Sequence, residues 1–251
     1  MAGFLGVNNR LQDNTAYTLS GNVNPDFAPA VDNRTSTDYF FAWDTVGAVT
    51  FEIDLQTPQA VNFLGIARHN LGNTGSTTLL LQYFDGAWLD FQPVITVENN
   101  QPIMIIGPEV TAQLWRVVIE NPEPASNLRF LMLGWGIELP RISAPHELIG
   151  YARQQQIISG ATGMAFLGPY SRTAVPGFTF TLDNYLEDEL NPIENHSMDF
   201  ICRSPFFYSY RNDLTSQDFK ALLVADGQPA LPRWKNVCLK SWQVKTIVLD
   251  G

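Results

Sequence analysis

Short apolar stretches closed by turn signals recur along the first half of this 251-residue chain. The clearest runs from Val49 to Leu55 and alternates strictly between apolar and polar residues. A period of two is typical of a β-strand with one buried face. Pro58 follows and is expected to end this strand. The pattern constrains the fold most because it leaves no room for long helices in this half.

Further strands are expected at similar intervals. The stretch Val61–Ala67 is apolar on both faces, which predicts a central strand. The other predicted strands are Leu79–Phe84, Trp88–Phe91, Ile103–Ile106, Trp115–Glu120 and Leu128–Gly134. Asp85-Gly86 is a strong tight-turn signal between two of them. About seven strands, roughly ten residues apart, predict a β-sandwich or barrel.

Composition excludes several classes of function. Hydrophobic residues make up 45% of the chain, so a full core can form. The formal net charge is −10 with no cluster of Lys or Arg, which argues against nucleic acid and against a polybasic membrane surface. No apolar stretch reaches the roughly 20 residues that span a bilayer. The start Met1–Gly6 lacks the features of a secretory signal, so folding in the cytoplasm of the producing cell is expected.

The sequence carries no recognisable catalytic or metal-binding motif. The three histidines, His69, His146 and His196, lack zinc-ligand spacing, and no nucleophile elbow, P-loop or dinucleotide fingerprint is present. The acidic stretch Glu187–Glu189 is interpreted as a solvated first helical turn rather than an acid–base pair. We therefore expect a protein that is not an enzyme.

Two cysteines leave an alternative open. Cys202 and Cys238 both stand in apolar surroundings. Two buried thiols are the favoured interpretation, and a disulfide is the alternative.

An ordered set of segments carries a resemblance to a known family. The segments are Val31–Ser36, the stretch around Trp43, Val49–Leu55, Gly65–Leu71, Leu81–Trp88 and Trp115–Ile119. Over residues 20–139 this set resembles the discoidin (F5/8 type C), galactose-binding-like jelly roll. The resemblance implies a β-sandwich whose loops at one end bind sugars, lipids or proteins. The form with His69-Asn70-Leu71 after the central strand is similar to modules in the tail and baseplate proteins of tailed bacteriophages.

The resemblance also implies candidate sites. Many members carry a structural calcium near the first strands, and Asp32 is the candidate ligand here, with Asp32-Asn33 in place of the usual Asp-Gly step. No other cofactor is expected. Arg68, His69 and Asn70 form either a sugar contact or a turn held by local hydrogen bonds.

The tryptophans are also candidates either for sugar binding or for packing. Trp43 and Trp88 stand near predicted loops and are either platforms for a sugar ring or packing residues. Trp115 alternates inward and is expected in the core.

The second half begins at two closely spaced prolines, Pro140 and Pro145. We therefore divide the chain into an N-terminal arm (1–19), the sandwich (20–139) and a β-rich assembly domain (140–251). Strands are expected at Gln154–Ser159, Phe178–Leu182, Met198–Cys202 and Phe206–Tyr210, with a final hairpin from Trp234 to Leu249. Phe219–Val224 fits a strand or a capped helix, and the strand is favoured.

One short helix is predicted in this half. Asp183-Asn184 is suited to cap a helix over Tyr185–Leu190, whose length Pro192 limits. The predicted class is thus all-β: a jelly-roll sandwich followed by a β-rich domain with a short helix. The stretch Cys202–Phe207 is similar to C-terminal domains that follow discoidin-like modules in phage tail proteins.

These features predict a structural component of a bacteriophage virion tail, at the tip or baseplate, made in the cytoplasm of the bacterial host. Its expected partners are further copies in a symmetric homo-oligomer and other tail proteins. Host-surface glycans are a further candidate partner. The alternative is a carbohydrate-binding module or lectin-like adhesin.

Overall fold

The computed structural model describes most of the chain. The described residues are 3–12, 16–20, 41–42, 47–73, 75–120, 126–139, 143–149, 152–159, 165–173, 177–186, 201, 204–209, 220–225, 233–234 and 240–250. The strands up to residue 139 are β1 (Gly3–Asn9), β2 (Ala16–Ser20), β3 (Phe41–Ala42), β4 (Val49–His69), β5 (Thr78–Phe84), β6 (Trp88–Asp90), β7 (Ile95–Thr96), β8 (Ile103–Glu120) and β9 (Asn127–Leu139). The strands after it are β10 (Ser143–Ile149), β11 (Ala152–Ser159), β12 (Ala165–Thr173), β13 (Gly177–Tyr185), β14 (Phe206–Ser209), β15 (Lys220–Ala225), β16 (Arg233–Trp234) and β17 (Lys240–Asp250). A 3-10 turn, η1 (Arg10–Gln12), follows β1.

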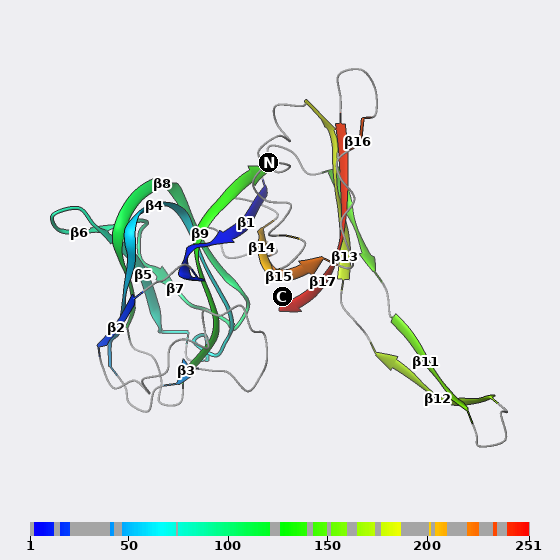
Figure 1. Cartoon of the computed structure of the whole chain (residues 1–251). Coiled ribbons are helices and arrows are strands. Elements are labelled where there is room, and N and C mark those ends of the chain that lie inside the picture. The colour runs from blue at the N-terminus through cyan, green and yellow to red at the C-terminus, as the bar shows by residue number, and fades with distance from the viewer. Residues whose placement is uncertain are drawn as a thin grey trace.

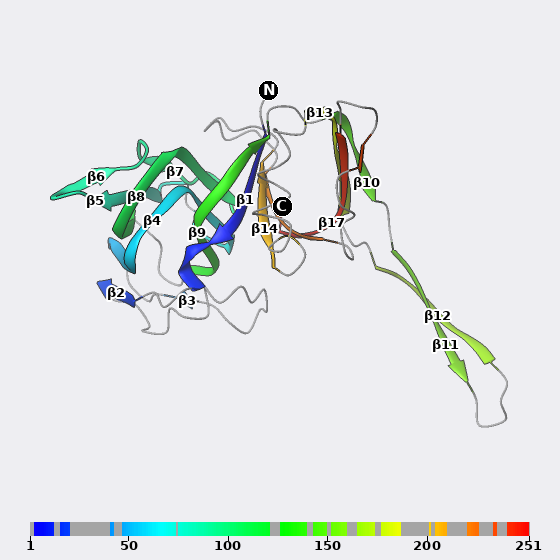
Figure 2. The same cartoon turned by 45° about the horizontal axis from the view of Figure 1, so that its top comes forward.

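All described strand pairs are antiparallel. One sheet runs in the order β10-β13-β17-β15-β14-β1-β9-β4-β8-β5-β6, with β2, β3, β7 and β16 attached beside this path. The hairpin of β11 and β12 forms a separate sheet that extends away from the other strands (Figures 1 and 2). The predicted all-β class is confirmed. Among the described residues, no helix has the length and apolar character that crossing a membrane requires.

Two long strands build the sandwich of the first half. β4 and β8 stay paired from Val49↔Ile119 to Ile66↔Ile103, and together they bend over as a curved ribbon (Figure 1). The first part of β4 pairs with β2 and its last part pairs with β9. The ribbon therefore belongs to both layers, and the predicted jelly-roll β-sandwich is confirmed.

The bend in the paired strands β4 and β8 explains why one predicted strand boundary was wrong. Pro58 was expected to end a strand, but it lies inside β4. The pairing of β4 with β8 breaks between Asp54 and Gln59, so Pro58 stands in a bulge where its missing N–H costs no ladder hydrogen bond. Pro108 lies opposite a second break, between Val61 and Phe63. The two irregularities let the paired strands turn from one layer into the other.

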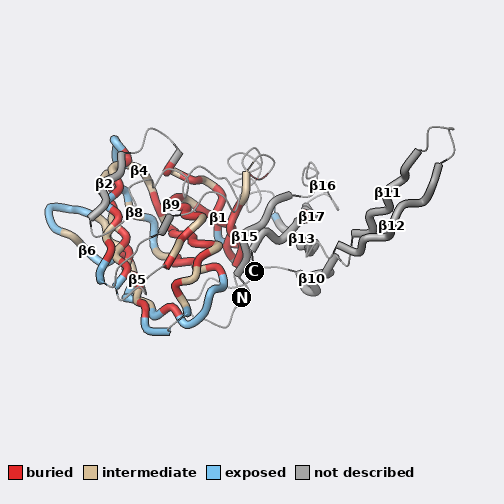
Figure 3. Tube along the Cα trace, turned by 90° about the horizontal axis from the view of Figure 1, so that it is seen from below, coloured by how far each residue is buried: buried red, intermediate tan, exposed pale blue. Residues whose placement is uncertain are grey.

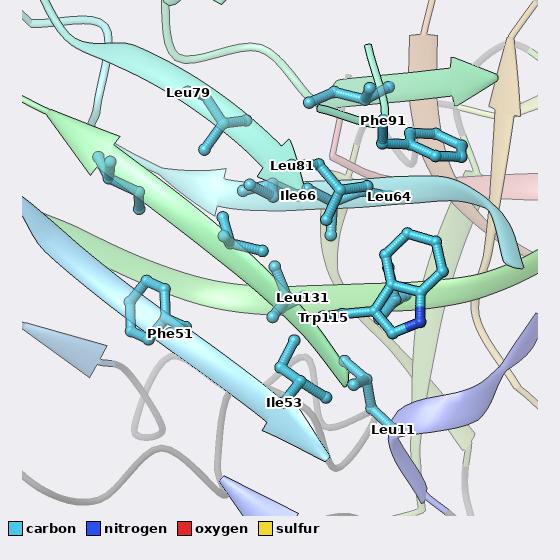
Figure 4. Packing of buried hydrophobic residues seen from close by; sticks show 14 of the residues in the cluster. Leu11, Phe51, Ile53, Leu64, Ile66, Leu79, Leu81, Phe91, Trp115 and Leu131 are labelled. Atoms are coloured by element: carbon cyan, nitrogen blue, oxygen red, sulfur yellow. The ribbon is translucent and has the colours of Figure 1, made fainter. Parts of the chain in front are cut away.

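The main core fills the space between the layers. Residues of this core from β4, β5, β8 and β9 point toward one another in Figure 4. Trp115 is fully buried, as predicted, with its ring centroid 5.7 Å from Tyr83 and 5.6 Å from Phe91. Its indole N–H donates to the carbonyl of Ala112 at 3.2 Å. Burying a large apolar side chain contributes roughly 2–3 kcal/mol, so this cluster supplies much of the sandwich's stability.

A second apolar cluster lies outside the main core and includes Phe207 of the second half. This cluster explains why Val61–Ala67 is apolar on both faces. Leu64 belongs to the main core, whereas Phe63 belongs to the second cluster. Gly65 makes room for the Phe207 ring, because a Cβ at Gly65 would overlap it. The second half therefore packs directly on the sandwich.

The first strand joins the two halves. β1 pairs with β9 on one edge and with β14 on the other. Phe4 and Leu5 in this strand are buried, and β1 and β9 lie in a largely buried part of the chain (Figure 3). Residues expected to form part of an N-terminal arm thus make an internal strand of the sheet. The three predicted domain boundaries remain predictions.

The second half confirms most of its predicted strands, as β11, β13, β14, β15 and the antiparallel pair β16–β17. Two predictions were wrong at described residues. Tyr185 was expected to begin a helix, but it belongs to β13 and pairs with Lys240, since strand pairing outweighs the local capping signal. Ile201 is helical, so the strand expected over Met198–Cys202 is not formed there. Residues 187–200, Cys202 and Cys238 lie outside the described residues.

Candidate functional site

The candidate residues Arg68, His69 and Asn70 lie where β4 ends, at one end of the sandwich. His69 is 5% exposed, and its ring nitrogens contact backbone groups of two residues. Its Nδ1 accepts from the N–H of Leu71 at 3.2 Å, and its Nε2 lies 2.9 Å from the carbonyl of Gln101. An accepting Nδ1 leaves Nε2 as the protonated nitrogen of a neutral ring, which then donates to Gln101. His69 thus fastens the loop before β8 to the end of β4.

Asn70 continues the pairing of β4 with β9. Its Oδ1 accepts from the N–H of Asn127 at 2.6 Å, and its own N–H donates to the carbonyl of Asn127 at 3.3 Å. Arg68 has a φ of +52°, the left-handed conformation that an L-residue seldom adopts. Only the hydrogen bond between Leu71 and His69 is local, as a turn would predict; the others join the end of β4 to Gln101 and Asn127, 32 and 57 residues away. A sugar contact at Arg68, His69 and Asn70 stays a prediction.

Side-chain amides hold two loops together at this same end. The N–H of Gly72 donates to Oδ1 of Asn100 at 2.9 Å, and Nδ2 of Asn100 donates to Oδ1 of Asn73 at 2.8 Å. A Cβ at Gly72 would overlap the backbone of Asn99, so the loops are in close contact. Sequence reasoning did not select these residues, although the pair Asn99-Asn100 beside Gln101 was a visible signal.

Trp88 lies on a different surface, the outer face of the layer formed by β2, β4, β8, β5 and β6. It pairs with Phe84 across the β5–β6 hairpin, with ring centroids 5.4 Å apart and an interplanar angle of 68°. The guanidinium carbon of Arg116 lies 4.3 Å from the centroid of the Trp88 ring. Trp88 is partly exposed and Phe84 is 40% exposed, so solvent reaches this aromatic pair.

A row of polar side chains crosses the strands beside this aromatic pair. The register aligns Glu52 of β4, Arg116 of β8, Gln82 of β5 and Asp90 of β6. Nε of Arg116 donates to Oε1 of Gln82 at 2.5 Å, and Nε2 of Gln82 donates to Oδ1 of Asp90 at 2.5 Å. This chain of hydrogen bonds fixes Arg116 over Trp88 and orients the row. We call Trp88, Phe84 and this row the Trp88 face.

The structure does not bring Trp88 together with His69 and Asn70. β5 starts at Thr78, near the sandwich end where the loops lie, and Phe84 opposite Trp88 is six residues further along the strand. At about 3.3 Å per residue this is roughly 20 Å. Figure 1 shows β6 away from β3, which pairs with β9 at the Asn70 end. The predicted sugar-binding residues thus divide into two separate surfaces.

The two remaining candidates, Trp43 and Asp32, lie outside the described residues. Ala42, directly before Trp43, pairs with Asn127 and so belongs to the Asn70 end. Among the described residues, no group of three or more His, Cys, Asp or Glu side chains is arranged to hold a metal ion. The calcium at Asp32 remains a prediction.

Arg116, Gln82 and Asp90 were not selected from the sequence as functional residues. The available signal was period two: an inward Trp115 places Arg116 outward. The alignment of these residues across three strands depends on register, which no single strand reveals.

No family model matches the sequence, and no curated protein matches it. Solved structures are similar to about half of the chain. CpGH89CBM32-5 from Clostridium perfringens, in complex with GalNAc-β-1,3-galactose, is 13% identical with a TM-score of 0.42, and the match covers 51% of this chain and 100% of that module. A pectin-binding carbohydrate-binding module is 14% identical with a TM-score of 0.38, covering 48% of this chain and 89% of the module.

The SpGH29 structure is 21% identical with a TM-score of 0.40, and the match covers 51% of this chain. The chain spans only 28% of that structure's length. Similarities at these TM-scores carry no functional argument.

Proposed function

We propose that this chain is a carbohydrate-binding protein and that glycan binds on the Trp88 face. The observation that carries this is the partly exposed Trp88 ring beside a hydrogen-bonded row of polar side chains. A sugar ring has an apolar C–H surface that packs on an aromatic face, and hydroxyls around its rim that need donors and acceptors. The Trp88 face offers both kinds of contact on neighbouring strands.

The discoidin-like resemblance of the sequence implies instead a site in the loops at the Asn70 end. The described contacts of His69 and Asn70 are to backbone atoms that hold those loops together. The contacts of the Trp88 face join side chains to one another across the strands, and these side chains project from a sheet whose core residues lie on the opposite side. These contacts favour the Trp88 face over the loops.

Screening the full chain on a broad glycan array, followed by calorimetry on the hits, tests this proposal. Trp88→Ala should abolish binding. Trp135→Ala is the matched control, because Trp135 is a partly exposed tryptophan of β9 whose N–H donates to Glu109, away from the Trp88 face. Both variants should keep the unfolding temperature close enough to that of the parent for binding to be measured in the folded state.

The outcomes separate the two surfaces. A blank array with the full chain would contradict carbohydrate binding. Binding that survives Trp88→Ala but is lost in Arg68→Ala would place the ligand at the Asn70 end and overturn the Trp88 face.

A second candidate is the structural component of a bacteriophage tail predicted from the sequence. One observation favours an assembly role: the β11–β12 hairpin forms a two-stranded sheet of its own, and such hairpins are marginally stable without a partner. Electron microscopy of virions labelled on this protein tests it. Particles without label would rule out the tail role while leaving glycan binding intact.

A further inference from the structure

The Trp88 face holds two carboxylates, those of Glu52 and Asp90, and one cation, Arg116. Asp54 stands two residues after Glu52 and so points to the same side of β4. Among the described residues of β2 and of β4 to β8, the only basic residues are Arg68 and Arg116, and Arg68 lies at the other end of the sandwich. A ligand on this face therefore meets a negative potential, which the net charge of −10 reinforces.

The single cation of the face is already engaged. Arg116 donates to Gln82 and lies over the Trp88 ring, so its charge is held against the aromatic surface. A uronic-acid carboxylate would have to approach between Glu52 and Asp90 to reach it. Like charges at such a site are unfavourable, which disfavours acidic glycans.

The carboxylates of Glu52 and Asp90 lie at opposite ends of the polar row rather than side by side. Glu52 and Asp90 are separated by β8 and β5, so their strands lie about 14 Å apart at the usual strand spacing. That separation is too wide for both to hold one metal ion, and it suits an extended chain lying across the strands. Positive groups repeated along such a chain would meet Asp90 on β6, the strand of Trp88, and Glu52 on β4, three strands away.

We propose that the Trp88 face selects glycans that carry free amino groups, with Asp90 and Glu52 as the specificity-determining residues. This inference rests on the proposed function, since it concerns the ligand of the same face. Trp88 packs against a sugar ring, and the ammonium groups of neighbouring sugars pair with Asp90 and Glu52. Exposed pairs of this kind each contribute about 2- to 5-fold in affinity, so the two together give roughly a 10-fold preference over the N-acetylated glycan.

Calorimetry with three oligosaccharides of equal length tests the selection on the full chain: glucosamine, N-acetylglucosamine and galacturonic acid oligomers. At about pH 5.5 free amines are protonated and free carboxylates are ionised. The glucosamine oligomer should bind roughly 10-fold more tightly than the N-acetylated one at low salt, and the difference should shrink at about 0.5 M salt. The galacturonic acid oligomer should bind most weakly.

The variants assign the preference to residues. Asp90→Asn and Glu52→Gln should each weaken glucosamine binding about 2- to 5-fold and leave N-acetylglucosamine binding unchanged. Asn at position 90 keeps an oxygen that can accept from Gln82, so the row stays ordered. Glu98→Gln is the control, because Glu98 is exposed in the loop at the Asn70 end and makes the same change in net charge.

Three outcomes would overturn the inference alone. The first is equal affinity for the glucosamine and N-acetylglucosamine oligomers, which leaves carbohydrate binding in place. The second is an equal loss in Glu98→Gln, which would assign the preference to the charge of the whole chain. The third is a neutral ligand on the glycan array with no binding of any of the three oligomers. A blank array would contradict the proposed function as well.

Discussion

The contact between Gly65 and Phe207 offers a direct test of how the two halves are joined. Phe207 is fully buried in the second apolar cluster, and its ring centroid lies 5.8 Å from that of Phe130. Removing the ring in Phe207→Ala should cost about 3–5 kcal/mol of unfolding free energy, as for other buried phenylalanines. Adding a methyl group in Gly65→Ala should cost about 1–3 kcal/mol, because the new Cβ overlaps the ring.

The double variant, Gly65→Ala with Phe207→Ala, tests whether the two residues are in contact or act independently. Without the Phe207 ring, the methyl group at position 65 has space and fills part of the cavity, so Gly65→Ala should then cost close to nothing. The expected coupling energy is thus about 1–3 kcal/mol. Phe51→Ala is the matched control: Phe51 is buried in the main core, in a different cluster from Phe207, and its loss should be additive with Gly65→Ala.

Urea unfolding of the full chain, followed by tryptophan fluorescence and circular dichroism, provides the four free energies. A loss of 1–3 kcal/mol corresponds to a fall in Tm of roughly 2–12 °C for a chain of this size. Additive effects of Gly65→Ala and Phe207→Ala would refute the contact. A coupling of the same size with Phe51→Ala would show a general weakening of the fold instead.

Three further predictions follow from the packing. The side chain of Asn62 donates to the carbonyl of Gly136 at 2.9 Å and accepts from its N–H at 2.7 Å, so Asn62→Ala should cost about 2–3 kcal/mol in urea unfolding; an unchanged midpoint would contradict this role. His69→Ala should speed amide hydrogen exchange in the loop around Gln101 by releasing its carbonyl, and unchanged exchange there would show that other contacts hold the loop. A chain cut after residue 139 should bind the dye ANS and aggregate, because it exposes the cluster that β14 covers; a soluble, ANS-silent fragment would show that the sandwich is independent.

Local patterns in the sequence predicted strands well. The alternation over Val49–Leu55 matches its alternating burial, and the both-sided apolar stretch Val61–Ala67 is the central strand that it predicted. Side-chain alternation is a property of one strand and its two faces, so it can be read without knowing the partner. The inward position of Trp115 followed from the same rule.

The candidate site was predicted only in part. Trp88 was selected, but it was grouped with His69 and Asn70, which lie on another surface. Arg116, which lies over the Trp88 ring, comes from β8, 28 positions further along the chain, and Gln82 comes from β5, the other strand of the hairpin. Register alone decides that both lie beside Trp88. Strand register depends on the whole sheet, so the neighbours of Trp88 were not visible in its own segment.

The sequence by itself determined the all-β class, the positions of most strands and the direction that their side chains face, because these depend on local periodicity. Only the tertiary structure decided that Pro58 stands in a bend, that β1 lies between the two halves, and that a polar row borders Trp88. Each of these depends on which distant strand pairs with which. Such pairings are settled by the packing of the complete sheet, and no local pattern of residues encodes them.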